Sequence, residues 1–288
     1  MIVVKISDGF GNQLFMYACG YAVAKRNHAE LLLDTSILDT NCLRKYELGY
    51  LNLFYNKRIT VSKYKSRIIM AAARKIKYFQ LFKNMNVFEE NLGKGFDKEI
   101  LKVTDNTYIS GYWQSEKYFS EYRADLTKQF VPKIERSESV IKLMHEIQSN
   151  NSVALHVRRG DYMNIGCQLD MGYYDKAIET IKSINPNKHF VLYVFSDDVN
   201  FCKEYFSKKL HKDDRYIELR YPIYKSDDYT LDDLFLMSKC NHIIMANSSY
   251  SWWAAWLNSN DEKMIICPEI GMWKGDYYPD DWLKISCD

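Results

Sequence analysis

The sequence predicts an α/β protein in which parallel sheets are covered by helices on both faces. Two observations support this fold class. Residues 2–33 contain a short apolar strand, a glycine-containing turn, a helix and a second strand in succession. Residues 153–266 alternate short apolar runs with segments of helical spacing. With 288 residues, 47% of them hydrophobic, the chain is long enough for two domains that each bury a core.

The chain opens with the first part of a doubly wound unit. We expect a strand at Ile2–Ile6, a turn at Ser7–Asn12, a helix at Gln13–Arg26 and a second strand at Glu30–Leu33. In such units, glycines after the first strand let the backbone approach a ligand. The G-x-G-N spacing is part of the dinucleotide-binding fingerprint, so a tight turn without a ligand is the alternative.

Segment 56–86 differs from the rest of the chain in its charge. It contains nine lysines and arginines and no acidic residue, and apolar runs lie between the charges. This pattern predicts a basic amphipathic helix or helical pair, which can contact an anionic membrane surface or an acidic partner. An ordinary solvated helix is the alternative. No nucleic-acid-binding motif accompanies the segment, so we expect no nucleic-acid partner.

An aromatic cluster follows the next predicted strand. Thr107–Ser110 is the strand, and Gly111–Gln114 follows it with Trp113 inside the cluster. Aromatic rings and an amide suit a sugar, and core packing of the rings is the alternative.

A domain boundary is predicted near the middle of the chain. Ser120–Gln148 has a helical and connective composition, and the polar run Ser149–Asn151 ends it. We therefore expect an N-terminal domain at 1–150 and a C-terminal domain at 151–288.

The second half is predicted to form a parallel sheet with intervening helices. Ligand-binding groups are then expected after the strands, at their carboxyl ends. The predicted strands are Val153–Val157, Phe190–Phe195, Tyr216–Leu219, His242–Met245 and Met264–Ile266, and the predicted helices are Tyr173–Ser183, Leu231–Ser238 and Ser251–Asn258.

The run His156–Tyr162 ends the first of these strands with one imidazole, two guanidiniums and a carboxylate. Two adjacent arginines are costly to bury unless an anion compensates them, and the guanidinium fork suits a phosphate. The run therefore predicts a phosphate or diphosphate site. A surface arginine pair joined to neighbouring acids is the alternative.

Two other strand ends carry polar residues. Ser196–Asp198 follows one strand, and Ala246–Trp253 follows another at the point where a helix begins. A helix start offers free N–H groups to an anion, although plain capping with buried tryptophans also explains the second run. Together with the arginines, this helix start would form the second side of a diphosphate clamp.

Composition limits the remaining possibilities. The seven cysteines are odd in number and lack C-x-x-C spacing, which favours buried thiols in a reducing compartment. The N-terminus does not resemble a signal peptide, and no apolar stretch approaches the roughly 20 residues of a membrane span. The chain lacks D-x-D spacing, so we expect no metal cofactor. A cytoplasmic protein is predicted, with peripheral contact at the inner face of the membrane through segment 56–86 as a further expectation.

The sequence resembles glycosyltransferase family 11, the α-1,2-fucosyltransferases, and chiefly its bacterial members. Three motifs carry the resemblance: Gly9–Phe15, His156–Tyr162 and Asn247–Trp256. They span most of the chain in the family's order. The resemblance implies a GT-B architecture, with two Rossmann-like domains facing across a cleft.

The family resemblance also implies a reaction and site residues. GDP-fucose would bind the C-terminal domain, a galactose-containing glycan would bind largely the N-terminal domain, and fucose would pass to the 2-hydroxyl of a terminal galactose with inversion and without a metal. The implied donor contacts are Arg158 with the diphosphate, His156 and Arg159 around the pocket, Asp233 with guanine, and Asn247, Ser248 and Ser249 with the phosphates. The implied cleft residues of the other domain are Gly9, Gly11 and Asn12, with Trp113 on the acceptor side.

The general base stays open at this point. Family members often carry Gly at the position of Asp8 and Gln at that of Met16, so Asp8 is either neutral variation or an extra acid in the cleft. Asp8 and Asp161 are the two candidate bases, and Asp161 can instead pair with Arg159. A fucosyltransferase of different linkage or with a protein acceptor, and a sugar-nucleotide or glycan-binding module without turnover, are the alternative functions.

Overall fold

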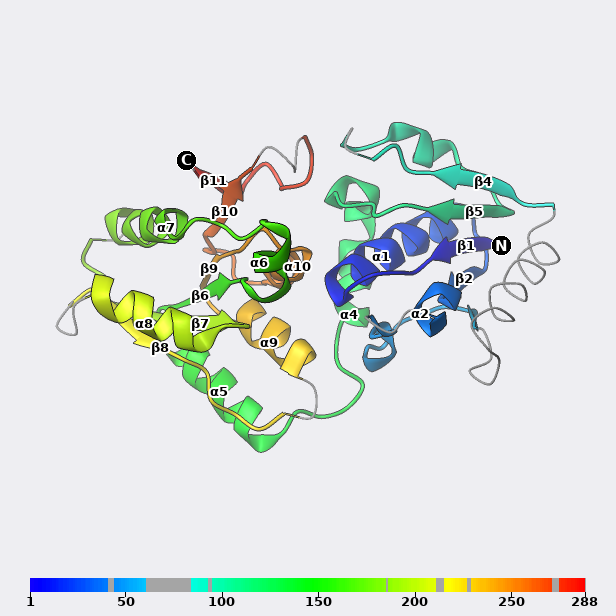
Figure 1. The fold of residues 1–288 in the computed structure, drawn as a ribbon. Coiled ribbons are helices and arrows are strands. Elements are labelled where there is room, and N and C mark those ends of the chain that lie inside the picture. The colour runs from blue at the N-terminus through cyan, green and yellow to red at the C-terminus, as the bar shows by residue number, and fades with distance from the viewer. Residues whose placement is uncertain are drawn as a thin grey trace. The chain divides into compact units, whose positions relative to one another are not determined.

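The computed structural model describes residues 1–40, 44–60, 84–92, 95–184, 186–210, 215–226, 229–270 and 275–287. The chain forms two compact units, each with its own parallel sheet (Figure 1). Unit 1 comprises Met1–Lys133 and Lys274–Pro279, and unit 2 comprises Ile134–Trp273 and Asp280–Asp288.

The sheet of unit 1 has the strand order β3-β2-β1-β5-β4, and all its strands are parallel. β2 and β3 therefore lie on one side of β1, and β5 and β4 lie on the other. The strands are β1 (Ile2–Lys5), β2 (Leu31–Asp34), β3 (Lys57–Ile59), β4 (Asn86–Glu89) and β5 (Thr107–Ser110).

Helix α1 (Phe10–Arg26) connects β1 to β2, and nearly every residue from Phe10 to Ala24 is buried. It begins earlier than predicted, because the amide of Gln13 bonds the carbonyl of Gly9 at 3.0 Å and closes the first turn there. The helix lies close to β1, since a Cβ at Gly20 would come within 2.7 Å of Val4. Shorter helices complete the unit: α2 (Ser36–Thr40), η1 (Leu48–Tyr50), η2 (Lys98–Lys102), η3 (Glu116–Tyr118), η4 (Ser120–Tyr122) and α4 (Arg123–Gln129).

The sheet of unit 2 has the strand order β11-β10-β9-β6-β7-β8 and is also parallel throughout. This is the order of a doubly wound dinucleotide-binding sheet, in which the strand order reverses beside the first strand. The strands are β6 (Ser152–Val157), β7 (Phe190–Ser196), β8 (Ile217–Arg220), β9 (His242–Ile244), β10 (Ile265–Glu269) and β11 (Leu283–Ser286).

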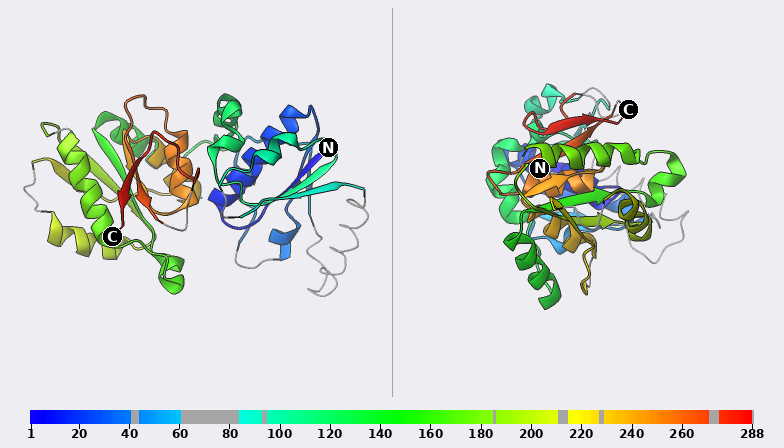
Figure 2. Two further views of the ribbon diagram at one scale, coloured as in Figure 1. Left: turned by 90° about the horizontal axis from the view of Figure 1, so that it is seen from above. Right: turned by 90° about the vertical axis from the view of Figure 1, so that its left-hand side faces the viewer.

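Helices cover both faces of this sheet. Figures 1 and 2 show α7 and α5 on opposite sides of it. Val153, Leu155 and Val157 of β6 point into a core with α7 and α8, so the alternate residues Ala154 and His156 face the other side. The helices are α5 (Glu138–Ser149), α6 (Gly160–Ile165), α7 (Met171–Ile184), α8 (Val199–Lys209), α9 (Tyr229–Ser238) and α10 (Ser249–Leu257).

The unit boundary lies at Lys133/Ile134, before the predicted boundary at 150/151. The physical reason is that α5 contacts β6 and α9 and therefore packs with the sheet that follows it. The polar run after α5 is the short turn between a helix and its strand, not a linker.

The basic segment 56–86 is predicted to be helical, and the structure describes only part of it. Residues 57–59 of the basic segment form β3, an edge strand paired with β2, and Asn86 begins β4. The rest of the predicted basic helix, 61–83, lies outside the described residues. The sequence patterns also missed α8 and β11. In the described part of the chain, no helix is both long and apolar enough to cross a membrane.

Candidate functional site

The predicted site residues of unit 2 lie where the strand order reverses in the sheet. β6 and β9 are neighbours, and the connections that leave them lead to opposite sides. In open parallel sheets a ligand-binding crevice forms outside the carboxyl ends of two such strands. Arg158 follows β6 at this edge, and Ala246–Ser249 follows β9.

Arg158 is held by two carboxylates. Its Nη2 bonds Asp161 Oδ1 at 2.5 Å, and its Nη1 lies 2.7 Å from Asp197 Oδ2. The ring of Tyr162 lies 5.4 Å from the guanidinium carbon. The side chain keeps 28% of its surface exposed. These contacts fix the direction of the guanidinium and leave it accessible at the carboxyl edge of the sheet.

Arg159 has a different environment. Its Nε lies 3.2 Å from Asp198 Oδ2, and its guanidinium carbon lies 3.4 Å from the centre of the Phe201 ring at the start of α8. Arg159 thus packs on a helix as part of the scaffold, and its role in shaping the donor pocket stays a prediction. The carboxylate that pairs with Arg159 is Asp198; Asp161 pairs with Arg158.

The run Ser196–Asp198 supports both arginines. Asp197 Oδ1 accepts from the backbone amide of Arg159 at 2.9 Å, and Asp198 caps α8 by accepting from the amide of Phe201 at 3.2 Å. A Cβ on Gly160 would lie 2.5 Å from Asp197 Oδ2. Gly160 is therefore needed for the close approach of this carboxylate to the arginine loop.

The start of α10 forms the other side of the site. Ser248 caps the helix, with its Oγ accepting from the amide of Tyr250 at 3.3 Å, and Ser249 is the first helical residue. The amides of the first turn have no partner further back in the helix, so they can bond an anion. Behind them, Trp252, Trp253 and Trp256 are buried and fix the helix in place.

Asn247 precedes this cap and is 4% exposed. Its Nδ2 donates to the carbonyl of Cys167 at 2.6 Å, while its Oδ1 is buried without a hydrogen-bond partner among the described residues. The phenol of Tyr162 donates to the backbone carbonyl of Asn247 at 3.2 Å. The two predicted halves of the clamp are therefore joined through Tyr162, which lies beside Arg158.

His156 lies under the site and not on its surface. It is 6% exposed, its Nδ1 is buried without a partner in the described chain, and its ring lies 5.7 Å from the Tyr250 ring. Burial, with the charge of Arg158, lowers the pKa of His156 to about 3. The imidazole is therefore neutral near pH 7 and adds no charge to an anion site.

Asp233 lies on α9, which packs against α10. The Tyr224 phenol donates to Asp233. The pKa of Asp233 is raised to about 6. Burial and the charge of the neighbouring Asp232 raise it, and the hydrogen bond from Tyr224 offsets part of this effect. Asp232 itself is bound by Arg136 at 2.7 Å. The phenol of Tyr250 donates to a carbonyl at the start of α9, which links Asp233 to the α10 side of the site.

Unit 1 holds a pocket of about 320 Å³ at the carboxyl edge of its sheet. Asp8, directly after β1, lines it and has φ 63°, a left-handed backbone conformation that is unusual outside glycine. The Asp8 carboxylate accepts from Ser7 Oγ at 2.8 Å. Burial, and then the charge and hydrogen bond of Asp8, raise the pKa of Tyr112. The other lining residues are Lys5, Ser7, Met16, Ile37, Leu38, Glu89, Glu90, Leu92, Ser110 and Gly111.

The expected cleft residues of unit 1 lie in different environments, some at the start of α1 and some in the core. Gly9 caps α1 with an ordinary φ of −76°, Gly11 is buried inside that helix, and Asn12 Oδ1 accepts from Gln114 Nε2 at 2.9 Å. Trp113 is fully buried, and it stacks on Phe88 with ring centroids 6.0 Å apart. The acceptor-side expectation for Trp113 is therefore corrected to a core position, because no face of its ring reaches the surface.

Glu90 explains the conformation of that aromatic cluster. Its Oε2 accepts from the amides of Tyr112 at 2.6 Å and Trp113 at 3.0 Å. A Cβ on Gly111 would lie 2.4 Å from the Cβ of Glu90, so this turn requires glycine. Burial raises the pKa of Glu90. The aromatic pattern left a sugar contact and core packing open, and it gave no sign of the carboxylate that positions the turn.

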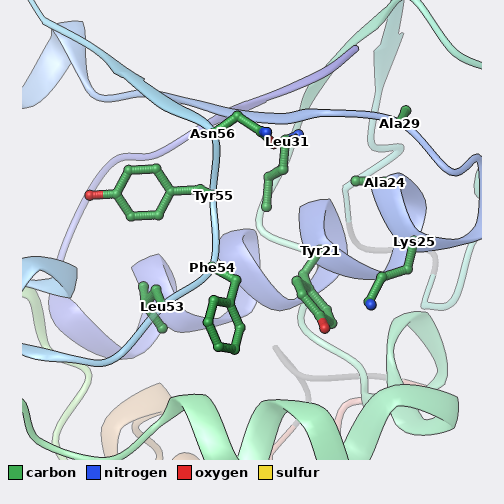
Figure 3. A pocket seen from close by; sticks show the side chains of 9 residues that line it. All are labelled: Tyr21, Ala24, Lys25, Ala29, Leu31, Leu53, Phe54, Tyr55 and Asn56. Atoms are coloured by element: carbon green, nitrogen blue, oxygen red, sulfur yellow. Dashed lines mark hydrogen bonds between the residues drawn. The ribbon is translucent and has the colours of Figure 1, made fainter.

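A second pocket of unit 1, of about 370 Å³, lies near the amino ends of its strands (Figure 3). Tyr21 and Lys25 of α1 lie on one side of it, and Phe54 and Tyr55 of the loop before β3 lie on the other. This pocket is at the edge of the sheet opposite to Asp8, and it contains none of the predicted catalytic, donor-binding or cleft residues.

Comparison with known proteins gives one family. The family model of glycosyl transferase family 11 matches residues 58–285. Two Escherichia coli proteins are similar over nearly their whole length: the O-antigen biosynthesis glycosyltransferase WbnK, at 29% identity over 97% of this chain and 99% of that one, and an α-1,2-colitosyltransferase, at 30% identity over 99% of both.

More distant proteins extend the similarity. Galactoside α-(1,2)-fucosyltransferase 2 of Hylobates lar is 24% identical over 91% of this chain and 70% of its own. The solved structure of an Arabidopsis thaliana FUT1 variant in complex with GDP matches with a TM-score of 0.54 and 13% identity, covering 96% of this chain and 72% of that one. The structural match supports the fold class, an α/β protein of GT-B type with two Rossmann-like sheets.

Proposed function

The chain belongs to glycosyl transferase family 11, and we propose that it transfers L-fucose from GDP-fucose to the 2-hydroxyl of a terminal galactose, or a similar hexose, in a surface polysaccharide or oligosaccharide. That it is a glycosyltransferase of the α-1,2-fucosyltransferase type follows from the family. The donor, the acceptor and the stereochemical course are the proposed parts.

One observation carries the proposal for the donor. Arg158 and the capped start of α10 lie at the reversal point of a doubly wound sheet, joined through Tyr162 and Asn247. A guanidinium and a helix start both favour a diphosphate. The relatives named fucosyltransferase or colitosyltransferase support a GDP-activated deoxyhexose as the molecule that carries this diphosphate.

The proposed reaction is a single displacement. The acceptor hydroxyl attacks the anomeric carbon of fucose as the bond to the β-phosphate breaks, and GDP leaves with the bonding electrons. Arg158 and the α10 amides stabilise the charge that grows on the phosphate. The hydroxyl proton passes to a carboxylate. Asp161 is engaged by Arg158, so we assign this role to Asp8, whose carboxylate lines the pocket of unit 1.

A metal ion is not part of this proposal, because Arg158 and a helix start supply positive charge for the leaving group. Assaying the enzyme with and without EDTA tests this. We expect activity to change by less than about twofold, and a loss that Mg²⁺ or Mn²⁺ restores would contradict it.

The test of function uses purified protein, GDP-fucose and a panel of galactose-terminated acceptors. We expect GDP release above donor hydrolysis in the presence of an acceptor, and methylation analysis should place the new fucose on the 2-position. Another linkage, or transfer to a protein, would favour the first alternative. GDP-fucose binding without acceptor-dependent release would identify a non-catalytic binding module.

A second donor has a specific observation behind it. The α-1,2-colitosyltransferase relative is 30% identical over 99% of both chains. Colitose is the 3-deoxy form of L-fucose, so GDP-colitose would fit the same diphosphate site. Comparing kcat/KM for the two donors with one acceptor decides between them.

Membrane contact is a separate proposal from composition. The basic segment 56–86 would bind an anionic surface by charge attraction. Flotation with anionic and neutral liposomes should show salt-sensitive binding to the anionic ones, and equal behaviour with both would refute the contact.

A further inference from the structure

The side-chain amide of Asn247 is satisfied at one end and unsatisfied at the other. Its Nδ2 donates to the Cys167 carbonyl at 2.6 Å. This contact fixes the orientation of the amide, because the reversed amide would place two oxygens at that distance. Its Oδ1 is buried without a partner among the described residues, and the whole residue is 4% exposed.

A buried acceptor without a partner is unusual and unfavourable. Such a group costs about 1–3 kcal/mol of stability, and nearly all buried polar atoms in folded proteins are paired. Asn247 is the residue directly before the Ser248 cap of α10, so it belongs to the loop that leads into this helix start. An unpaired acceptor at this place indicates a ligand group that donates a hydrogen bond.

The chemistry of Oδ1 excludes the diphosphate as that group. An ionised phosphate presents acceptors and has no hydrogen to donate, whereas an amide oxygen only accepts. In a nucleotide sugar the groups on either side of the diphosphate are the ribose and the transferred sugar. Both carry hydroxyls, which donate.

The segment that is hydrogen-bonded to Asn247 is weakly attached. Every residue of α6 is described, and none of them is buried. Its contacts with the site are polar: Asp161 with Arg158 at 2.5 Å, the Tyr162 phenol with the Asn247 carbonyl at 3.2 Å, and the carbonyl of Cys167, just after the helix, with Asn247 Nδ2. A helix without buried side chains opens at low cost, so Oδ1 can become accessible when a ligand binds Arg158.

We propose that Asn247 Oδ1 accepts a hydrogen bond from a hydroxyl of the sugar nucleotide, on its ribose or on its transferred sugar. Asn247 is then a residue that recognises donor hydroxyls, in place of the phosphate contact expected from the sequence. The inference rests on the proposed function, since it takes a GDP-sugar as the ligand.

The test measures binding by calorimetry without acceptor. The ligands are GDP-fucose, its analogues lacking the 2-, 3- or 4-hydroxyl of fucose, GDP, and GDP lacking the 2′- or 3′-hydroxyl. We expect the wild type to bind one analogue about tenfold more weakly than the compound that keeps the hydroxyl. A tenfold change in Kd is the effect expected for the loss of one hydrogen bond. Asn247→Ala should bind that analogue and its parent equally.

Tyr162→Phe is the matched control. It removes the phenol that donates to the Asn247 carbonyl and leaves Oδ1 in place, so it should keep the tenfold discrimination. A weak ribose analogue identifies the ribose as the source of the hydroxyl, and a weak fucose analogue identifies the transferred sugar.

Two results would overturn the inference. If Asn247→Ala discriminates among the analogues as the wild type does, Asn247 is structural. Should the variant not fold, the wild type still decides, because equal affinity for every analogue and its parent also refutes the contact. Failure of every GDP compound to bind the wild type would instead refute the proposed function, and this inference with it.

Discussion

The ends of β1 and β6 occupy equivalent places in two sheets of similar strand order, yet the first charged side chain after each strand has the opposite sign. β1 lies between β2 and β5 and is followed by Asp8 at a pocket that Glu89 and Glu90 also line. β6 lies between β7 and β9 and is followed by Arg158. Strand order fixes where a ligand can bind, and the few residues after the strand fix the charge of that ligand.

The helices that follow these strand ends differ as well. α1 is buried along nearly its whole length, whereas no residue of α6 is buried. Burial of α1 holds the turn at Asp8 in a strained conformation, because the packed helix fixes the chain direction. The exposed α6 leaves the loop of Arg158 dependent on ion pairs, which a charged ligand can replace.

Removing the positive charge after β6 has the largest expected effect. Arg158→Ala should lower kcat by about 10²–10³-fold, the usual cost of one preorganised donor to a developing anion. Steady-state kinetics with GDP-fucose measures it. Arg220→Ala is the matched control, because Arg220 makes partly exposed ion pairs with Glu146 and Glu218, which are worth little. Near-normal turnover of Arg158→Ala would remove this arginine from the mechanism.

Removing the negative charge after β1 tests the other half of the comparison. Asp8→Asn should lower kcat by about 10²-fold, since an amide cannot take the proton. Asparagine tolerates the left-handed backbone, so the fold should be kept. The measurement is kcat against pH for wild type, Asp8→Asn and Asp161→Asn. A pH profile altered in Asp161→Asn alone would transfer the role of base to Asp161.

The glycines after the two strands should respond differently to substitution. A Cβ at Gly160 would lie 2.5 Å from Asp197 Oδ2, whereas a Cβ at Gly9 would come no nearer than 3.9 Å to Arg44. We expect Gly160→Ala to displace the carboxylate that holds Arg158, with a cost of about 1–3 kcal/mol and reduced turnover. Gly9→Ala should unfold like the wild type in urea. Equal effects of the two substitutions on stability would show that the packing after β6 is no tighter than the packing after β1.

His156 should make the stability of unit 2 depend on pH. Its pKa is about 3 in the folded protein and about 6.5 in an unfolded chain, so unfolding takes up a proton between these values. Stability should therefore fall on acidification from about pH 6.5 to 3, by up to about 1.4 kcal/mol per pH unit. Urea titrations of His156→Gln should give a shallower slope. His145→Gln, at an exposed position of α5, is the control and should keep the wild-type slope.

Most elements of the fold follow from local patterns. β1, β5, β6 and β7 were predicted to within about two residues, because continuous apolar runs bounded by polar turns are typical of buried parallel strands. α8 was missed, since its sequence from Val199 to Lys209 is polar and buries few residues. β11 was missed because it is short and mostly exposed at the edge of its sheet.

The candidate site divides in the same way. Local patterns were enough to place Arg158 at a strand end and Ser248 at a helix start, because both positions depend on the local order of elements. The three-dimensional packing was needed to show that Asp197 holds Arg158, that Asp198 holds Arg159, and that Trp113 belongs to the core. These partners come from other strands and helices, and which residues meet across a sheet depends on strand order and register, which local periodicity does not contain.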